Sequence, residues 1–179
     1  ILFLLVVGSI HNTYSQNFSK RKVNNLKSHA AKLVEEDKKM TQVMIDKVFS
    51  FGELGFQEFE TSKYLSNILE ENGFELQYNI SDIPTSWLAT WSNGSGGPVI
   101  ALGSDFDGVP STSQYPGVAY EKPVVEGAPG HGEGHNIGLP IVITAALSIK
   151  KVMIENNING TLLLWPGVAE EILGSKAWY

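Results

Sequence analysis

The sequence has 179 residues, of which 42% are hydrophobic and 18% are charged, and it contains no cysteine. This is the composition of a globular chain that is long enough to bury one hydrophobic core. The net charge of −6 and the lack of a basic patch argue against binding to nucleic acid, because phosphates are bound by clustered Lys and Arg. The absence of cysteine also excludes disulfides and thiolate ligands.

The chain begins with an apolar run, Ile1–Val7, which is far shorter than the roughly 20 residues of a membrane span. The run is typical of the hydrophobic part of a secretory signal, and Thr13 and Ser15 are small residues before an expected cleavage at Gln16. A buried N-terminal strand is the alternative. We expect residues 1–15 to be a truncated signal segment, so that the protein is exported (periplasmic or secreted) without stable membrane insertion.

The pattern of apolar residues predicts that helices and strands alternate along the chain. Helices are expected at 23–49 (as one or two helices), 61–72 and 137–156, and strands at 74–80, 86–91, 99–102 and 161–165. The last two strands are fully apolar, which is typical of central strands. The alternation predicts an α/β fold whose sheet is mixed, mainly parallel and flanked by helices.

Acidic residues follow both apolar strands. Asp105 and Asp107 come directly after the strand at 99–102, and Glu170 and Glu171 come after the strand at 161–165. Strand ends in open α/β sheets are common ligand sites, although each segment alone could be a turn with local hydrogen bonds. The long loop between Ser111 and Pro129 has no predicted helix or strand, and such loops are often functional.

Between these two acidic segments lies Gly130–Asn136, with the sequence GHGEGHN, just before the predicted helix at 137–156. His131, Glu133 and His135 offer imidazole nitrogen and carboxylate oxygen, which are good ligands for divalent metals. A glycine-rich turn with solvated side chains is the alternative. Because three such segments are expected at one edge of the sheet, we favour a metal site.

Adjacent glutamates have a specific use at a metal site. Neighbouring side chains point in different directions, so one carboxylate can bind the metal while the other faces the attacking water. A metal lowers the pKa of bound water, and a nearby carboxylate can accept the proton and pass it to a leaving amine. The pattern therefore predicts metal-assisted hydrolysis of an amide.

These segments resemble a family of zinc metallopeptidases and amidohydrolases that includes aminoacylases, glutamate carboxypeptidases and auxin-conjugate hydrolases. The similarity is greatest to its branch of B-type aminobenzoyl-glutamate utilisation proteins. It extends from about Phe49 to Lys176 through the segments 53–58, 104–107, 130–136 and 169–171. The order of these segments is specific to the family, whereas no single segment is.

The resemblance implies a role for each matching residue. Glu170 matches the general base, and the metal ligands are expected to be His135, Glu171 and Glu133. The amidohydrolase branch usually has Cys at the position of Glu133, and a carboxylate is a harder ligand that favours oxygen-preferring metals. Three residues are expected to support the ligands or contact substrate: Asp105, Asp107 and His131, of which His131 could also be a ligand.

The resemblance also implies the organisation of the whole protein. Residues 16–179 correspond to the N-terminal portion of a catalytic domain, with the lid or dimerisation domain and the C-terminal half missing. We therefore expect a homodimer when full length, a small-molecule amide substrate, and two divalent ions, which are zinc or else manganese or cobalt. The isolated chain is expected to be inactive alone. The alternative is a binding or regulatory relative that has lost the metal.

Overall fold

The computed structural model describes residues 16–174, so the apolar run at the N-terminus lies outside the described residues. Every helix and strand expected within this range is present, with shifts of a few residues at the ends. The helices are α1 (Lys20–Glu36), α2 (Lys38–Phe51), α3 (Phe59–Glu71) and α4 (His135–Glu155). The strands are β1 (Glu75–Tyr78), β2 (Trp87–Asn93), β3 (Val99–Asp105) and β4 (Gly160–Gly167). Two short 3-10 turns are η1 (Ile80–Asp82) and η2 (Glu170–Ile172).

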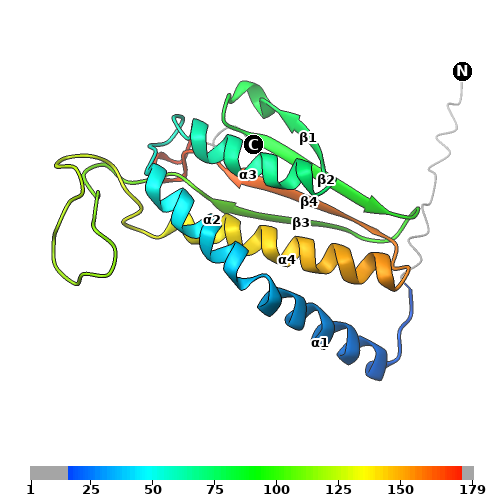
Figure 1. Ribbon diagram of the computed structural model, residues 1–179. Helices are drawn as coiled ribbons and strands as arrows, with labels where there is room; N and C mark the ends of the chain where they lie inside the picture. The colour runs from blue at the N-terminus through cyan, green and yellow to red at the C-terminus, as the bar shows by residue number, and fades with distance from the viewer. Residues whose placement is uncertain (1–15, 175–179) are drawn as a thin grey trace, which may run out of the picture.

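The four strands form one mixed sheet in the order β1-β2-β4-β3 (Figure 1). β1 pairs with β2, and β2 with β4, in antiparallel fashion, whereas only β3 and β4 are parallel. The α/β class is confirmed, but the prediction of a mainly parallel sheet is wrong. The connections between the strands explain this, because parallel neighbours need a long crossover and antiparallel neighbours do not. Only β3 and β4 are joined through a crossover helix, α4, while β1 and β2 are joined by a short turn.

The apolar strand at 99–102 is not central. β3 lies at the edge of the described sheet, and Val99 and Ile100 are 63% and 46% exposed. Its neighbour β4 is central, as predicted, with β2 on one side and β3 on the other. An apolar run indicates that a strand packs against other elements, and Leu102 of β3 does pack on the core. The run does not indicate whether the strand has one or two neighbouring strands.

The hydrophobic core lies between the sheet and the helices on one of its faces. α3 contacts β1 and β2, α4 contacts β3 and β4, and α1 and α2 pack against α4 (Figure 1). Alternate residues of the strands point into this core, among them Trp87 and Ala89 of β2 and Leu162 and Leu164 of β4. The core thereby fixes the strand ends and the start of α4 relative to one another.

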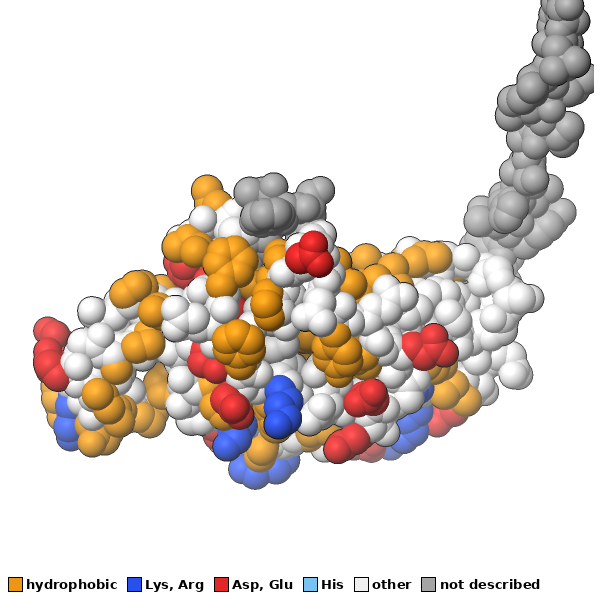
Figure 2. All heavy atoms as spheres, turned by 90° about the horizontal axis from the view of Figure 1, so that it is seen from above, with side chains coloured by type: hydrophobic (Ala, Val, Ile, Leu, Met, Phe, Trp, Pro, Cys, Tyr) orange, Lys and Arg blue, Asp and Glu red, His pale blue; other side chains and the backbone are white. Residues whose placement is uncertain are grey.

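The opposite face of the sheet carries side chains that are only partly covered. Leu88 and Leu163 are half-buried, and Trp165 is exposed; Leu88 and Trp165 line a shallow hollow with Ile80. The view from above in Figure 2 shows hydrophobic side chains spread over the surface of the described residues. These side chains account for part of the apolar composition that does not enter the core.

Helix α4 is long and apolar enough to cross a membrane by length and composition alone. In this fold it packs against β3, β4, α1 and α2, and residues such as Leu139 and Ile143 are fully buried. The inner side of the helix is therefore part of the core, whereas Ile141 and Ile154 are 51% and 50% exposed.

The face-specific burial of β4 predicts unequal effects of two leucine substitutions. Leu164→Ala should lower the free energy of unfolding by about 2–5 kcal/mol, because a buried side chain leaves a cavity in the core. Leu163→Ala, on the half-buried opposite face, should cost less. Urea denaturation of both variants would measure the two costs, and equal losses would contradict the assignment of the core face.

Candidate metal centre

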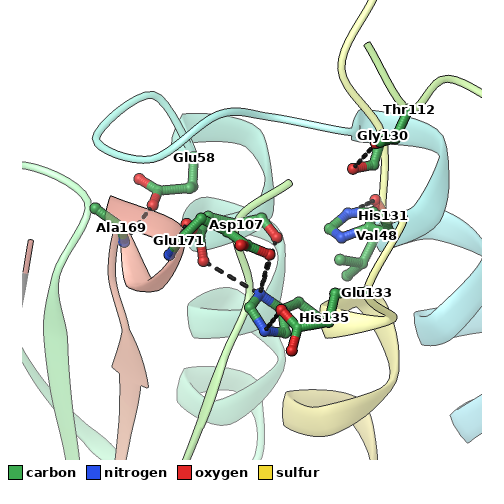
Figure 3. A network of polar contacts seen from close by, with 10 residues as sticks. All are labelled: Val48, Glu58, Asp107, Thr112, Gly130, His131, Glu133, His135, Ala169 and Glu171. Atoms are coloured by element: carbon green, nitrogen blue, oxygen red, sulfur yellow. Dashed lines mark hydrogen bonds and ion pairs between the residues drawn. The ribbon is translucent and has the colours of Figure 1, made fainter. Parts of the chain in front are cut away.

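Three segments that are far apart in the sequence meet at one end of the fold (Figure 3). They are the residues that follow β3, the turn that follows β4, and the first residue of α4, His135. The core described above holds these three segments in place. The arrangement brings together all the predicted acidic segments and one of the two predicted histidines.

His135 lies at the centre of this cluster and its side chain is 13% exposed. Its Nδ1 atom lies 3.1 Å from the carbonyl oxygen of Asp107. A carbonyl can only accept a hydrogen bond, so Nδ1 carries the proton. The neutral ring then presents its other nitrogen, Nε2, as a lone pair. Histidines that bind metals commonly donate their second ring N–H to a carbonyl in this way.

The Nε2 atom of His135 faces the carboxylate of Glu133 at 3.1 Å. With the proton on Nδ1, both Nε2 and the carboxylate offer lone pairs, so a cation shared by the two groups would balance the contact. Glu133 is 59% exposed at its side chain, so the contact lies at the open side of the cluster.

Asp107 ties His135 to the turn after β4. The carboxylate is fully buried; Oδ2 accepts a hydrogen bond of 3.0 Å from the backbone N–H of Glu171, and Oδ1 lies 3.3 Å from His135 Nδ1. Glu171 Oε1 is 3.8 Å from the same nitrogen. Asp107 Oδ1 and Glu171 Oε1 are both buried and make no hydrogen bond among the described residues; His135 Nδ1 is their ion-pair contact.

Two overlapping groups of side chains have ligand atoms close enough to share a metal ion. In each group the atoms lie within 4.8 Å of one another: Glu133, His135 and Glu171 form one group, and Asp105, His135 and Glu170 form the other. Glycine at position 167 leaves room for Asp105, because a Cβ atom there would lie 1.8 Å from the Asp105 Oδ1 atom. The nitrogen and oxygen ligand atoms of these groups suit a divalent cation. The buried carboxylate oxygens that make no hydrogen bond fit the same interpretation.

Electrostatics support this fit. Burial and the neighbouring carboxylate of Glu133 raise the pKa of Glu171, whereas His135 acts in the opposite direction. Carboxylates that crowd together without a counterion disfavour ionisation of one another. A divalent cation reverses this effect, because it is the largest local charge in such a site.

His131 lies apart from both groups. It is buried, and its Nε2 lies 3.1 Å from the carbonyl oxygen of Val48 in α2, with Phe49 against its ring. The preceding residue is anchored too, because Gly130 exchanges two backbone hydrogen bonds with Val109. The structure thus brings His135 and Glu133 into the cluster, while His131 holds the loop to α2.

The burial of His131 predicts a pH dependence of stability. Burial lowers its pKa below the usual value near 6.5, and the Val48 carbonyl only partly opposes this. The unfolded chain therefore binds this proton more readily, and stability should fall as the pH drops through about 6.5 towards the folded pKa. In metal-free protein, the loss of unfolding free energy from about pH 7.5 to 5.5 should be smaller in His131→Gln. An unchanged loss would contradict the assignment.

One residue of this region was not predicted to have a role. Glu58 is completely buried, and its carboxylate accepts hydrogen bonds from the backbone N–H of Ala169 at 2.8 Å and from the Thr85 hydroxyl at 2.9 Å. Burial raises its pKa, whereas the hydrogen bonds lower it. In the sequence, a carboxylate directly before a helix is expected to cap that helix or to face solvent. The sequence therefore has no signal of the contact between Glu58 and Ala169.

The fold and the cluster define a class: α/β domains that present carboxylates and an imidazole from strand ends and a helix start, suited to a divalent metal. No family model matches the sequence. The B-type component of the p-aminobenzoyl-glutamate hydrolase of Escherichia coli (strain K12) is 32% identical over 138 residues, which are 77% of this chain and 28% of that protein. The chain thus spans little more than a quarter of the length of this relative.

Several solved structures are similar in fold, among them the following two. One is a protein of methicillin-resistant Staphylococcus aureus assigned as an aminohydrolase, with a TM-score of 0.57, 19% identity, and coverage of 84% of this chain and 35% of that one. The other is the YXEP protein of Bacillus subtilis, a dinuclear metal-binding peptidase from the M20 family, with a TM-score of 0.51, 21% identity, and coverage of 84% and 40%. The sequence match shows that the chain belongs to the metallopeptidase and amidohydrolase family, in its aminobenzoyl-glutamate branch, and the two structures agree in fold.

Proposed function

We propose that the protein is a metal-dependent hydrolase of a small amide. The observation that carries this proposal is the environment of His135. Its Nδ1–H is fixed by the Asp107 carbonyl, its Nε2 faces Glu133, and nearby buried oxygens of Asp107 and Glu171 make no hydrogen bond within residues 16–174. A histidine oriented in this way among carboxylates is suited to hold a divalent cation.

The proposal gives each residue of the cluster a role. His135, Glu171 and Glu133 bind the metal, and Asp105 contributes from the end of β3. Asp107 orients His135 and the backbone of Glu171. A divalent metal, when bound, makes water more acidic and polarises the amide carbonyl.

Glu170 is proposed as the general base. It accepts the proton of the attacking water and donates it to the nitrogen of the leaving amine as the C–N bond breaks. Its carboxylate has a ligand atom within 4.8 Å of those of Asp105 and His135, so it lies beside the proposed metal position. The neighbouring Glu171 is the proposed metal ligand, so the role of base is assigned to Glu170.

The proposed substrate is an N-acyl amino acid, a dipeptide or an amide like aminobenzoyl-glutamate. The name of the Escherichia coli relative supports the last of these, since that protein is part of a p-aminobenzoyl-glutamate hydrolase. Zinc is the first candidate for the metal, with two ions in the full-length protein, as in the dinuclear peptidase of similar fold. Manganese and cobalt are alternatives, because Glu133 supplies oxygen where thiolate is usual.

The experiment is a hydrolysis assay of the full-length protein with these three kinds of amide. Released amine should be detected with at least one of them, should be lost after chelation, and should return on addition of zinc, manganese or cobalt. A folded protein that binds metal but cleaves none of them would favour the alternative of a binding relative. Export and homodimer formation remain predictions, which localisation of the protein and its mass in solution would test.

A further inference from the structure

We propose that Glu58 is a positioning residue, which holds the turn after β4 so that Glu170 and Glu171 face the metal centre. This role rests on the function proposed above. The carboxylate of Glu58 is completely buried, 111 residues away in sequence from Ala169, whose backbone N–H it accepts at 2.8 Å. Ala169 directly precedes the two glutamates.

A helix-capping role does not account for Glu58. It occupies the N-cap position of α3, yet its side chain makes no capping hydrogen bond. The carboxylate of Glu53 accepts the backbone N–H groups of Glu60 and Thr61 at 2.9 and 2.8 Å instead. Glu58 is therefore directed at the turn after β4, and the Thr85 hydroxyl donates to its second oxygen at 2.9 Å.

The backbone conformation of Ala169 sets the course of the turn after β4. It has the left-handed conformation (φ 53°, ψ 44°), which alanine rarely adopts and which therefore has to be held by its surroundings. Its N–H is held by Glu58, and its carbonyl accepts the N–H of Gly174 at 2.8 Å. Loss of the Glu58 contact would release this residue towards ordinary conformations and rotate the peptide that leads into Glu170.

The same loop also contacts the end of β3. The carbonyl of Glu53 accepts the N–H of Gly108, next to Asp107, at 2.7 Å. At Gly55, a Cβ atom would lie 2.9 Å from Ala169, so the loop can approach the turn closely only because glycine stands there. Residues 52–58 thus fix two strand ends against each other, the one that carries Asp107 and the one that carries Glu171.

The contact between Glu58 and Ala169 affects the geometry of the metal centre. Asp107 binds the backbone of Glu171 from one side of the turn, and Glu58 binds Ala169 two residues earlier. With both contacts present, the two glutamates have one fixed arrangement relative to His135. Outer partners of metal ligands typically contribute a factor of about 10–100 in metal affinity or activity.

The test compares Glu58→Leu, which removes both acceptors, with Glu58→Gln, which keeps an oxygen to accept the Ala169 N–H and a nitrogen to donate to Thr85. Glu70→Gln on the exposed side of α3 is the matched control for the loss of charge. The first readout, on the full-length protein without metal, is amide hydrogen exchange of residues 168–172 relative to the strands of the sheet. The second is cobalt binding, followed by the absorption bands of the bound ion.

Glu58→Leu should exchange faster at 168–172 with the sheet unchanged, and it should bind cobalt about 10–100-fold more weakly. Glu58→Gln and Glu70→Gln should resemble the wild type in both readouts. A protected turn with unchanged cobalt affinity in Glu58→Leu would overturn the proposal. So would a loss of affinity that is equal in Glu58→Leu and Glu58→Gln, or faster exchange that extends over the whole sheet.

If Glu58→Leu does not fold, Thr85→Val replaces it. This variant removes only the hydroxyl that fixes the second oxygen of Glu58, so exchange at 168–172 should rise less. An unchanged turn in Thr85→Val would then overturn the proposal. If the wild type binds no cobalt, the proposed function fails, whereas the exchange of the turn still decides the role of Glu58.

Discussion

Replacement of Glu170 by Gln should lower the rate of amide hydrolysis by the full-length protein about 10²–10⁴-fold, which is the usual contribution of a positioned general base. Gln has nearly the same shape but cannot accept the proton of the attacking water. The rate constant kcat should carry the loss, with KM little changed, because substrate binding does not depend on this proton. The measurement is steady-state kinetics on the best substrate of the assay above.

The same samples need a measurement of bound metal. Metal content should be unchanged in Glu170→Gln, since Glu171 and not Glu170 is the proposed ligand. Glu70→Gln, an exposed charge neutralisation on α3, should retain full activity. If Glu170→Gln loses its metal together with its activity, Glu170 is a ligand, as its place beside Asp105 and His135 allows, and the base has to be sought elsewhere.

Replacement of His135 by Ala should have the largest effect on metal affinity. His135 belongs to both groups of ligand atoms, so its loss removes the imidazole ligand whichever group holds the ion. We expect affinity to fall by more than the factor of about 100 that marks the upper range for residues outside the metal's direct ligands. Titration of the chelated protein with zinc or cobalt would measure the change.

His29→Ala is the matched control, because this half-exposed histidine contacts Glu155 at 3.5 Å on the outer side of the helices. Its metal affinity should equal that of the wild type. Folding of both variants can be compared by circular dichroism. Unchanged affinity in folded His135→Ala would remove the centre from this end of the fold.

Much of this architecture could be predicted from the sequence. The 3.6-residue period of α1 to α3, the largely apolar stretch of α4 and the apolar runs of β3 and β4 are local signals, and they predicted these elements within a few residues. The meeting of Asp107, His135 and Glu171 followed from a general rule about strand ends. For these residues, local pattern and topology agree.

Other features depend on contacts that no local pattern contains. The edge position of β3 depends on which strands pair, and its apolar run would read the same at the centre of a sheet. The mainly antiparallel pairing depends on the short connection from β1 to β2. Glu58 is a carboxylate before a helix, and only the folded chain directs it to Ala169.

The proposed function requires a divalent metal at His135, and the metal content of the purified full-length protein tests this requirement most directly. After dialysis against metal-free buffer and reloading with zinc, elemental analysis should find about two ions per chain. The His135→Ala variant, treated in the same way, should retain a small fraction of that amount. A folded wild-type protein that retains no more metal than His135→Ala would contradict the account.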